Sequence, residues 1–114
     1  MSERPQLLYC QDILESGAAI LSYVQGITCD AFVQDRMRYS AVIREFEIIG
    51  EAVGKLSEEL KSRYPEIPWQ DINDFCNLLA HEYFGVDLEI VWNTIRDDLP
   101  LLMDAVQKIV SGIK

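Results

Sequence analysis

The apolar positions of this sequence recur at helical intervals along most of its length. Steps of three and four residues place them on one helix face over residues 5–25 and again over residues 30–56. The first set is Leu7, Cys10, Leu14, Gly17, Leu21 and Val24, and the second is Tyr39, Val42, Phe46, Ile49, Val53 and Leu56. Each stretch therefore predicts one long amphipathic helix, and Thr28 or Asp30 can cap the second.

Residues 57–68 predict a short helix followed by a loop. Ser57 followed by two acidic residues is typical of a helix N-terminus, so we expect a short helix that ends near Arg63. Pro65 and Pro68 then predict a loop over residues 64–68, because the residue before a proline avoids the α-helical region.

The remainder of the chain predicts two more helices. Apolar spacing indicates one helix from Trp69 to about Glu82, which Gly85 ends. Asp87 can cap the last helix, whose apolar residues keep helical spacing to the C-terminus: Leu88, Val91, Ile95, Leu99, Leu102, Val106, Ile109 and Ile113. Pro100 lies inside this run and predicts a kink, since proline lacks a backbone donor and clashes with the preceding turn.

The fold class follows from these patterns. No stretch shows the alternation of a β-strand, an internal repeat or low complexity. We therefore expect a single all-α domain over residues 1–114, an antiparallel bundle of four main helices and one short helix, with the last helix kinked. Four helices in so short a chain cannot bury every apolar side chain, which is compatible with a dimer interface.

The charge of the chain narrows the choice of partners. Ten Lys and Arg residues against nineteen Asp and Glu residues give a formal net charge of −9. Phosphate binding depends on Lys and Arg, so this balance argues against a general basic surface, and we expect no DNA partner. The hydrophobic content of 49% argues against a disordered chain.

The cysteines and the histidine lack the spacing of a zinc site. Cys10, Cys29 and Cys76 show no Cys-x-x-Cys spacing, and His81 is the one histidine. We therefore expect no metal and no cofactor, with the thiols serving as small core residues. No run approaches the roughly 18 apolar residues of a membrane span. Charges interrupt the N-terminal segment, so we expect no signal peptide and a reducing, cytoplasmic setting.

Residues 76–84 hold the only histidine and carry the most evident chemistry. Asn77 and His81 lie about 40° apart on one face of the predicted helix, whereas Leu79 points to nearly the opposite side. His81 is thus off the apolar stripe, where it can exchange protons near neutral pH while Asn77 orients it. An ordinary surface histidine hydrogen-bonded to Asn77 fits the same spacing, and the residues alone leave both interpretations open.

Several blocks of residues resemble one known family in their order and spacing. They are Arg-Glu-Phe-Glu-Ile-Ile-Gly-Glu-Ala at 44–52, Tyr-Pro-Glu-Ile-Pro-Trp at 64–69, Leu-Ala-His-Glu-Tyr-Phe at 79–84, Asp-Leu-Glu-Ile-Val-Trp at 87–92 and Asp-Leu-Pro at 98–100. From Arg38 onward the chain is similar to the HEPN superfamily, and within it to the HepT-like toxins of HepT–MntA toxin–antitoxin pairs.

The resemblance implies a dimeric helical bundle with a metal-independent ribonuclease site where two copies of a motif meet. The family motif is Arg, four residues, His, one residue, Tyr. In this chain His81 would move the proton and Asn77 would support it. Tyr83 would accept AMP from a nucleotidyltransferase antitoxin. The phosphate charge of the added AMP would then keep RNA from binding at the site. Cys76 stands at the position of the family arginine, which would hold the phosphate.

Cys76 leaves the activity of this chain open. A thiol cannot make the bidentate cationic contact of an arginine, and losing one such donor costs about 10²–10³ in rate. Its place on the apolar stripe predicts a buried, inert thiol rather than a redox nucleophile. Arg36, Arg38 and Arg44 on the preceding helix are candidates for binding RNA instead, or they are solvated surface charges.

Three functional interpretations therefore remain. The first is an active ribonuclease toxin, and the second is a catalytically impaired interaction domain that a nucleotidyltransferase binds and modifies. The third, a nucleotide-binding helical protein without RNA chemistry, is disfavoured because the chain has no glycine-rich phosphate loop.

Overall fold

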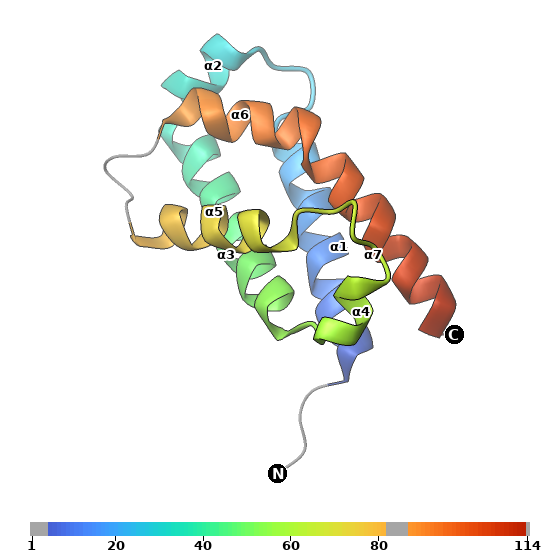
Figure 1. Ribbon diagram of the computed structural model, residues 1–114. Coiled ribbons are helices and arrows are strands. Elements are labelled where there is room, and N and C mark those ends of the chain that lie inside the picture. Colours follow the sequence, from blue (N-terminus) through green and yellow to red (C-terminus); the bar gives the residue numbers. More distant parts are fainter. Residues whose placement is uncertain (1–4, 82–86, 114) are drawn as a thin grey trace.

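The computed structural model describes residues 5–81 and 87–113 and, within these ranges, all side chains except those of His81 and Ile113. Helices and short connections make up this part of the chain, without a β-strand, so the predicted all-α class is confirmed (Figure 1). The helices are α1 (Gln6–Tyr23), α2 (Cys29–Gln34), α3 (Arg36–Lys55), α4 (Glu58–Ser62), α5 (Trp69–His81), α6 (Leu88–Asp97) and α7 (Leu99–Ile113).

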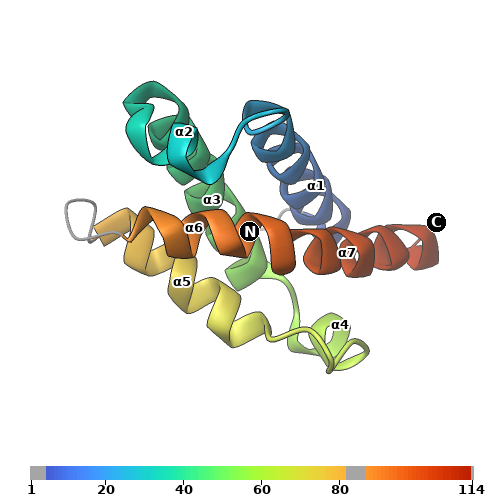
Figure 2. The ribbon, with the colours of Figure 1, turned by 90° about the horizontal axis from the view of Figure 1, so that it is seen from above.

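The helices pack around a core that α1, α3 and α7 share with α5 and α6. The long helices α1 and α3 lie side by side, α7 packs on α1, and α5 packs on α3. Seen from above, α6 and α7 lie between α1 and α2 on one side and α4 and α5 on the other (Figure 2). The helices α1, α3, α5, α6 and α7 each contribute fully buried side chains, among them Ile13, Ile20, Ile49, Leu79, Ile95 and Val106.

The prediction of one helix over residues 30–56 was wrong, because the chain breaks at Asp35. Its backbone is extended (φ −106°, ψ 90°), and its side chain accepts a hydrogen bond from the Arg38 backbone N–H at 3.1 Å. An aspartate that bonds the backbone in this way favours a helix start over a helix interior. The break turns α2 so that buried Phe32 packs against Trp92 of α6, with ring centroids 5.4 Å apart.

The predicted helix caps are confirmed. Thr28 accepts from the Ala31 N–H at 3.1 Å, and Ser57 accepts from the Leu60 N–H at the same distance. The Asp87 carboxylate accepts hydrogen bonds from the backbone N–H groups of Glu89 and Ile90, at 2.9 and 3.4 Å. Short polar side chains satisfy otherwise unpaired donors at these three helix starts, which is why the sequence marks these positions. Gly85, the expected end of the α5 segment, lies outside the described residues.

The bend expected at Pro100 takes the form of a one-residue break between α6 and α7. Asp98 separates the two helices, and the chain changes direction there (Figure 1). Pro100 is the second residue of α7, a position where a missing N–H removes no helical hydrogen bond. The proline therefore begins a helix and does not distort the middle of one.

Candidate functional site

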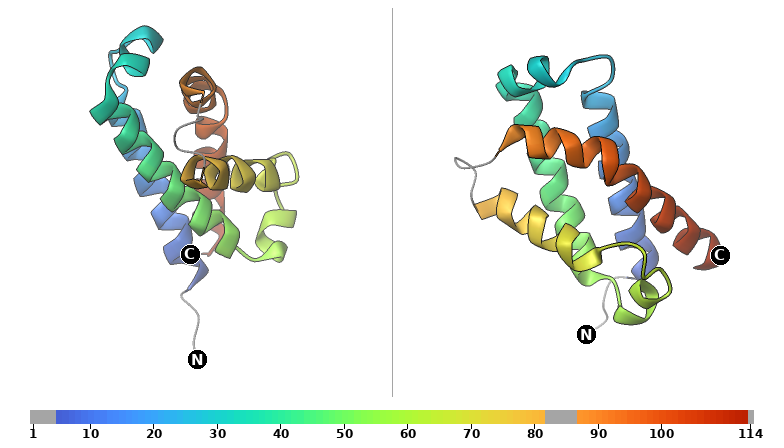
Figure 3. Two further views of the ribbon diagram at one scale, coloured as in Figure 1. Left: turned by 90° about the vertical axis from the view of Figure 1, so that its left-hand side faces the viewer. Right: turned by 45° about the horizontal axis from the view of Figure 1, so that its top comes forward.

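The site that the sequence singles out lies where α5 crosses α3 (Figure 3). Gly50 of α3 and Cys76 of α5 mark the point of closest approach: a Cβ added at Gly50 would lie 2.3 Å from the Cys76 Cβ. One turn along, a Cβ at Gly54 would lie 3.0 Å from the Asn73 Nδ2. Two glycines four residues apart on α3 thus let the α5 side chains approach its backbone.

Cys76, at the position of the family arginine, is buried in this crossing. Its exposed fraction is 1%, and burial raises the pKa of its thiol to about 12, opposed by a hydrogen bond with the Gly50 backbone. The thiol is therefore protonated at neutral pH and has no thiolate character. The structure agrees with the interpretation of Cys76 as a core thiol, and it supplies no positive charge at this position.

A polar groove of about 410 Å³ runs along one side of the crossing. We call it the α3–α5 groove. Its charged and amide side chains are Arg44, Glu47, Glu51 and Lys55 from α3 and Asn73 and Asn77 from α5. The groove carries two positive and two negative side chains, so its net charge is near zero.

Asn77 is held in the groove by a second amide that the sequence analysis missed. The Asn77 Nδ2 donates to the Asn73 Oδ1 at 3.1 Å, and the Asn73 Nδ2 donates to the Gly50 carbonyl oxygen at 2.9 Å. The spacing of four residues between two asparagines on one helix was the available signal, since such pairs face each other on a helix surface. The anchor on α3 could not be read from the sequence.

The three candidate arginines differ in their relation to the groove. Arg44 lines it, with its Nη1 3.2 Å from the Glu47 Oε2. Arg38 is bound elsewhere, through an ion pair with Asp35 at 3.1 Å and a hydrogen bond to the Tyr23 carbonyl oxygen. Arg36 begins α3, about 12 Å along the helix axis from Arg44, and does not line the groove. Of the three arginines, only Arg44 lines the same groove as Asn77.

The remaining motif residues are at the edge of what the structure describes. α5 is continuous from Asn77 to His81, which places their backbones one turn apart on the same helix. The His81 side chain and all of Tyr83 lie outside the described residues, so their predicted roles stay predictions.

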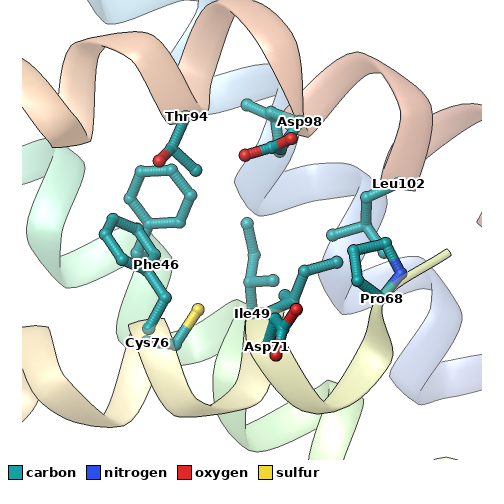
Figure 4. A pocket seen from close by; sticks show the side chains of 11 residues that line it. Phe46, Ile49, Pro68, Asp71, Cys76, Thr94, Asp98 and Leu102 are labelled. Carbon is teal, nitrogen blue, oxygen red and sulfur yellow. The ribbon is translucent and has the colours of Figure 1, made fainter.

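On the other side of Cys76 lies an apolar cavity of about 310 Å³, between α5 and the α6–α7 turn (Figure 4). Its apolar lining includes Phe46, Ile49, Phe75, Leu99 and Leu102. The carboxylates of Asp71 and Asp98 face it, and no described Lys or Arg lines it. Cys76 borders both spaces, and of the two the α3–α5 groove is the one that Arg44 and Asn77 line.

Comparison with known proteins decides the family. The profile described as "Ribonuclease HepT-like" matches residues 13–109. The chain belongs to the HepT-like ribonuclease family, within the HEPN superfamily. It is 37% identical over 101 residues to the "Probable ribonuclease HepT" of Thermococcus cleftensis, covering 89% of this chain and 92% of the relative.

Two further relatives match over nearly their whole length. "Putative RNase TTE0752" of Caldanaerobacter subterraneus subsp. tengcongensis is 37% identical over 106 residues, covering 93% of this chain and 95% of the relative. "Putative RNase MJ0127" of Methanocaldococcus jannaschii is 32% identical over 114 residues, covering 100% of this chain and 94% of the relative. No solved structure matches the chain.

The described residues contain neither a cluster of metal ligands nor a membrane-spanning helix. No group of three or more His, Cys, Asp or Glu side chains in residues 5–81 and 87–113 could hold a metal ion. None of the helices in those ranges is both long enough and apolar enough to cross a membrane.

Proposed function

We propose that this protein is the ribonuclease toxin of a two-gene toxin–antitoxin module, acting on RNA in the cytoplasm. Membership of the HepT-like family supports the reaction class. The observation that carries the assignment of the site is the α3–α5 groove, which holds Asn77 and Arg44 together one helical turn before His81. A cation, an amide and a histidine are the groups that a phosphodiester cleavage at this place needs.

The proposed reaction is cleavage of RNA by its own 2′-hydroxyl. His81 accepts the proton of that hydroxyl, the 2′-oxygen bonds to the adjacent phosphorus, and the bond from phosphorus to the 5′-oxygen breaks. The 5′-oxygen takes up a proton, which leaves a 2′,3′-cyclic phosphate and a 5′-hydroxyl end. Arg44 binds the phosphate and offsets its charge in the absence of a cation at position 76.

We place the site at the interface of a homodimer, as the family resemblance implies. Apolar side chains exposed near the motif support this placement: Leu78 on α5 and Ile90 on α6 are each 53% exposed. Large apolar side chains next to a functional segment fit a protein interface better than open solvent. In the dimer, two copies of the motif would face one RNA strand.

The proposed control is AMP transfer to Tyr83 by a nucleotidyltransferase antitoxin. The Tyr83 oxygen would attack the α-phosphorus of ATP, the bond from that phosphorus to the bridging oxygen would break, and pyrophosphate would leave. The tyrosine proton passes to a base on the antitoxin or to water. Because Tyr83 lies two residues after His81, the added phosphate charge and bulk would exclude RNA from the site.

Cys76 favours a second candidate function. Its buried, protonated thiol provides no charge where the family resemblance places an arginine. The chain would then be a catalytically impaired HEPN domain that binds the nucleotidyltransferase and is modified by it, without cleaving RNA.

Expression of the chain, Cys76→Arg and His81→Ala separates the two candidates through cell growth and RNA integrity. Cys76 borders both the groove and the apolar cavity, so a longer side chain has room to leave the crossing. Cleavage by the chain as given, lost in His81→Ala, supports the ribonuclease. Cleavage by Cys76→Arg alone supports the impaired domain, and cleavage by neither dimeric protein refutes the ribonuclease proposal.

The modification has its own test. The chain and a Tyr83→Phe variant are incubated with ATP and the neighbouring nucleotidyltransferase, and their masses are measured. We expect gains of whole AMP units on the chain and none on Tyr83→Phe. Equal gains on both proteins would assign the modification to another residue.

A further inference from the structure

Two amide side chains on α5 form a series that ends on the backbone of α3. We propose that Asn73 is a positioning residue, which fixes the side-chain amide of Asn77 in one orientation within the RNA-cleaving site. The inference rests on the proposed ribonuclease function for its role in catalysis, and on two hydrogen bonds in the structure for its geometry. Asn73 belongs to none of the blocks that carry the family resemblance.

The direction of both hydrogen bonds is fixed by the first acceptor. A carbonyl oxygen can only accept, so the Asn73 amide must turn its Nδ2 toward Gly50 O, 2.9 Å away. Its Oδ1 then faces Asn77, which must donate from its own Nδ2 across 3.1 Å. Among the described residues the Asn77 Oδ1 then has no hydrogen-bond donor, and a flipped Asn77 amide would place two oxygens against each other.

The backbone of α3 is shaped to receive this amide. Gly50 lets α5 approach closely, since a Cβ there would lie 2.3 Å from the Cys76 Cβ. Gly54 leaves room for the amide itself, because a Cβ there would lie 3.0 Å from the Asn73 Nδ2. The Gly50 carbonyl has a second lone pair beyond its helical hydrogen bond, and the Asn73 amide uses it.

A fixed acceptor suits the proposed reaction. The acceptor sits one turn before His81, and the groups that the reaction brings to this face are donors, the imidazole N–H and the RNA 2′-hydroxyl. An acceptor held in place before substrate binds needs no reorientation during the reaction, which favours the transition state. Asn73 would thus act on the rate through Asn77, without touching RNA.

A double-mutant cycle on RNA cleavage tests this role. We expect Asn73→Ala to lower kcat about 10- to 100-fold with little change in KM, as for a misplaced catalytic group. In the Asn77→Ala background the same substitution should lower kcat no further, because its target is gone. An equal loss in both backgrounds, or no loss in either, would overturn the proposal.

Gln70→Ala is the matched control. The Gln70 Nε2 donates to the Asp74 Oδ1 at 2.8 Å. Like Asn73 and Asn77, these two residues are four positions apart on α5, but they do not line the groove. Its removal should leave kcat unchanged. Circular dichroism of each variant checks that α5 keeps its helix, so that a loss of rate is not a loss of structure.

A spectroscopic measurement decides the geometry independently of activity. In the ¹⁵N–¹H correlation spectrum, the side-chain NH₂ signals of Asn77, assigned with Asn77→Ala, should shift toward free-amide positions in Asn73→Ala and stay in place in Gln70→Ala. Unchanged Asn77 signals in Asn73→Ala would refute the positioning role. An absence of RNA cleavage by the unmodified chain would instead refute the proposed function, so the two failures are distinguishable.

Discussion

Gly50 and Cys76 are in direct contact where α3 and α5 cross, and the hydrogen atom of the glycine is all that the contact allows. A Cβ at position 50 would lie 2.3 Å from the Cys76 Cβ, well inside van der Waals distance. This contact sets how closely the two helices approach, and therefore which side chains reach the α3–α5 groove.

The first prediction concerns this crossing. Gly50→Ala should lower the free energy of unfolding by about 1–3 kcal/mol, the usual cost of overpacking, even though alanine favours the helix. Urea denaturation measures the difference. Gly112→Ala is the control, because nothing lies within 4 Å of a Cβ at that glycine, and it should be neutral or slightly stabilising. Equal effects of the two substitutions would contradict the packing argument.

The second prediction is a loss of stability at alkaline pH that depends on Cys76. Burial raises the pKa of the thiol from its ordinary value of 9.0 to about 12 in the folded chain. Between these values the unfolded chain releases the proton and the folded chain keeps it, so stability falls as the pH rises above 9.0.

Urea denaturation at pH 8 and pH 10 tests this. At pH 10 the thiol alone should remove about 1.4 kcal/mol from the free energy of unfolding, and Cys76→Ala should lack this part of the decline. Other groups contribute equally to both proteins, so the difference isolates Cys76. If the two proteins lose the same stability between these pH values, the thiol is not held protonated by the fold.

The third prediction concerns the charge balance of the α3–α5 groove. If Arg44 binds RNA, Arg44→Ala should weaken the binding of single-stranded RNA and reduce the salt slope of log K by about 0.7. Glu47→Gln should strengthen binding, because it removes the carboxylate 3.2 Å from the guanidinium. Fluorescence anisotropy at several salt concentrations measures both effects.

Arg36→Ala is the matched control for this series, since it removes the same charge from the same helix outside the groove. It should change affinity and salt slope less than Arg44→Ala does. If both variants lose the same affinity, RNA contacts α3 through its general charge and the groove has no special part in binding.

The fourth prediction concerns the proposed dimer. Leu78→Glu should shift the protein to a monomer and abolish RNA cleavage while leaving the helical content unchanged, because a charge cannot be buried in an apolar interface without large cost. Sedimentation velocity measures the state of association. Leu101→Glu alters an equally apolar, 61% exposed side chain on α7 and should leave the dimer intact. A dimer that persists in Leu78→Glu places the interface elsewhere.

The helix caps show how much of the fold could be predicted from the sequence. Thr28, Ser57 and Asp87 were recognisable as caps because a cap depends only on a short polar side chain and the three residues after it. Asp35 was missed, because the apolar positions that predicted this helix begin only at Tyr39 and therefore do not show where the helix starts. A cap can therefore be recognised from the sequence only where the start of its helix is also clear from the pattern.

The candidate site was likewise only partly predictable from the sequence. The sequence alone was enough to predict His81, Asn77 and Tyr83 as motif residues and to show that position 76 is not an arginine, because both depend on residue identity and on the order of the motif in the family that the chain resembles. The tertiary structure alone decided that Arg44 and not Arg38 lines the same groove as Asn77, and that the Asn73 side chain donates to the Gly50 carbonyl oxygen. Helical periodicity fixes the faces of one helix, whereas the crossing point of two helices depends on side chains that pack between them.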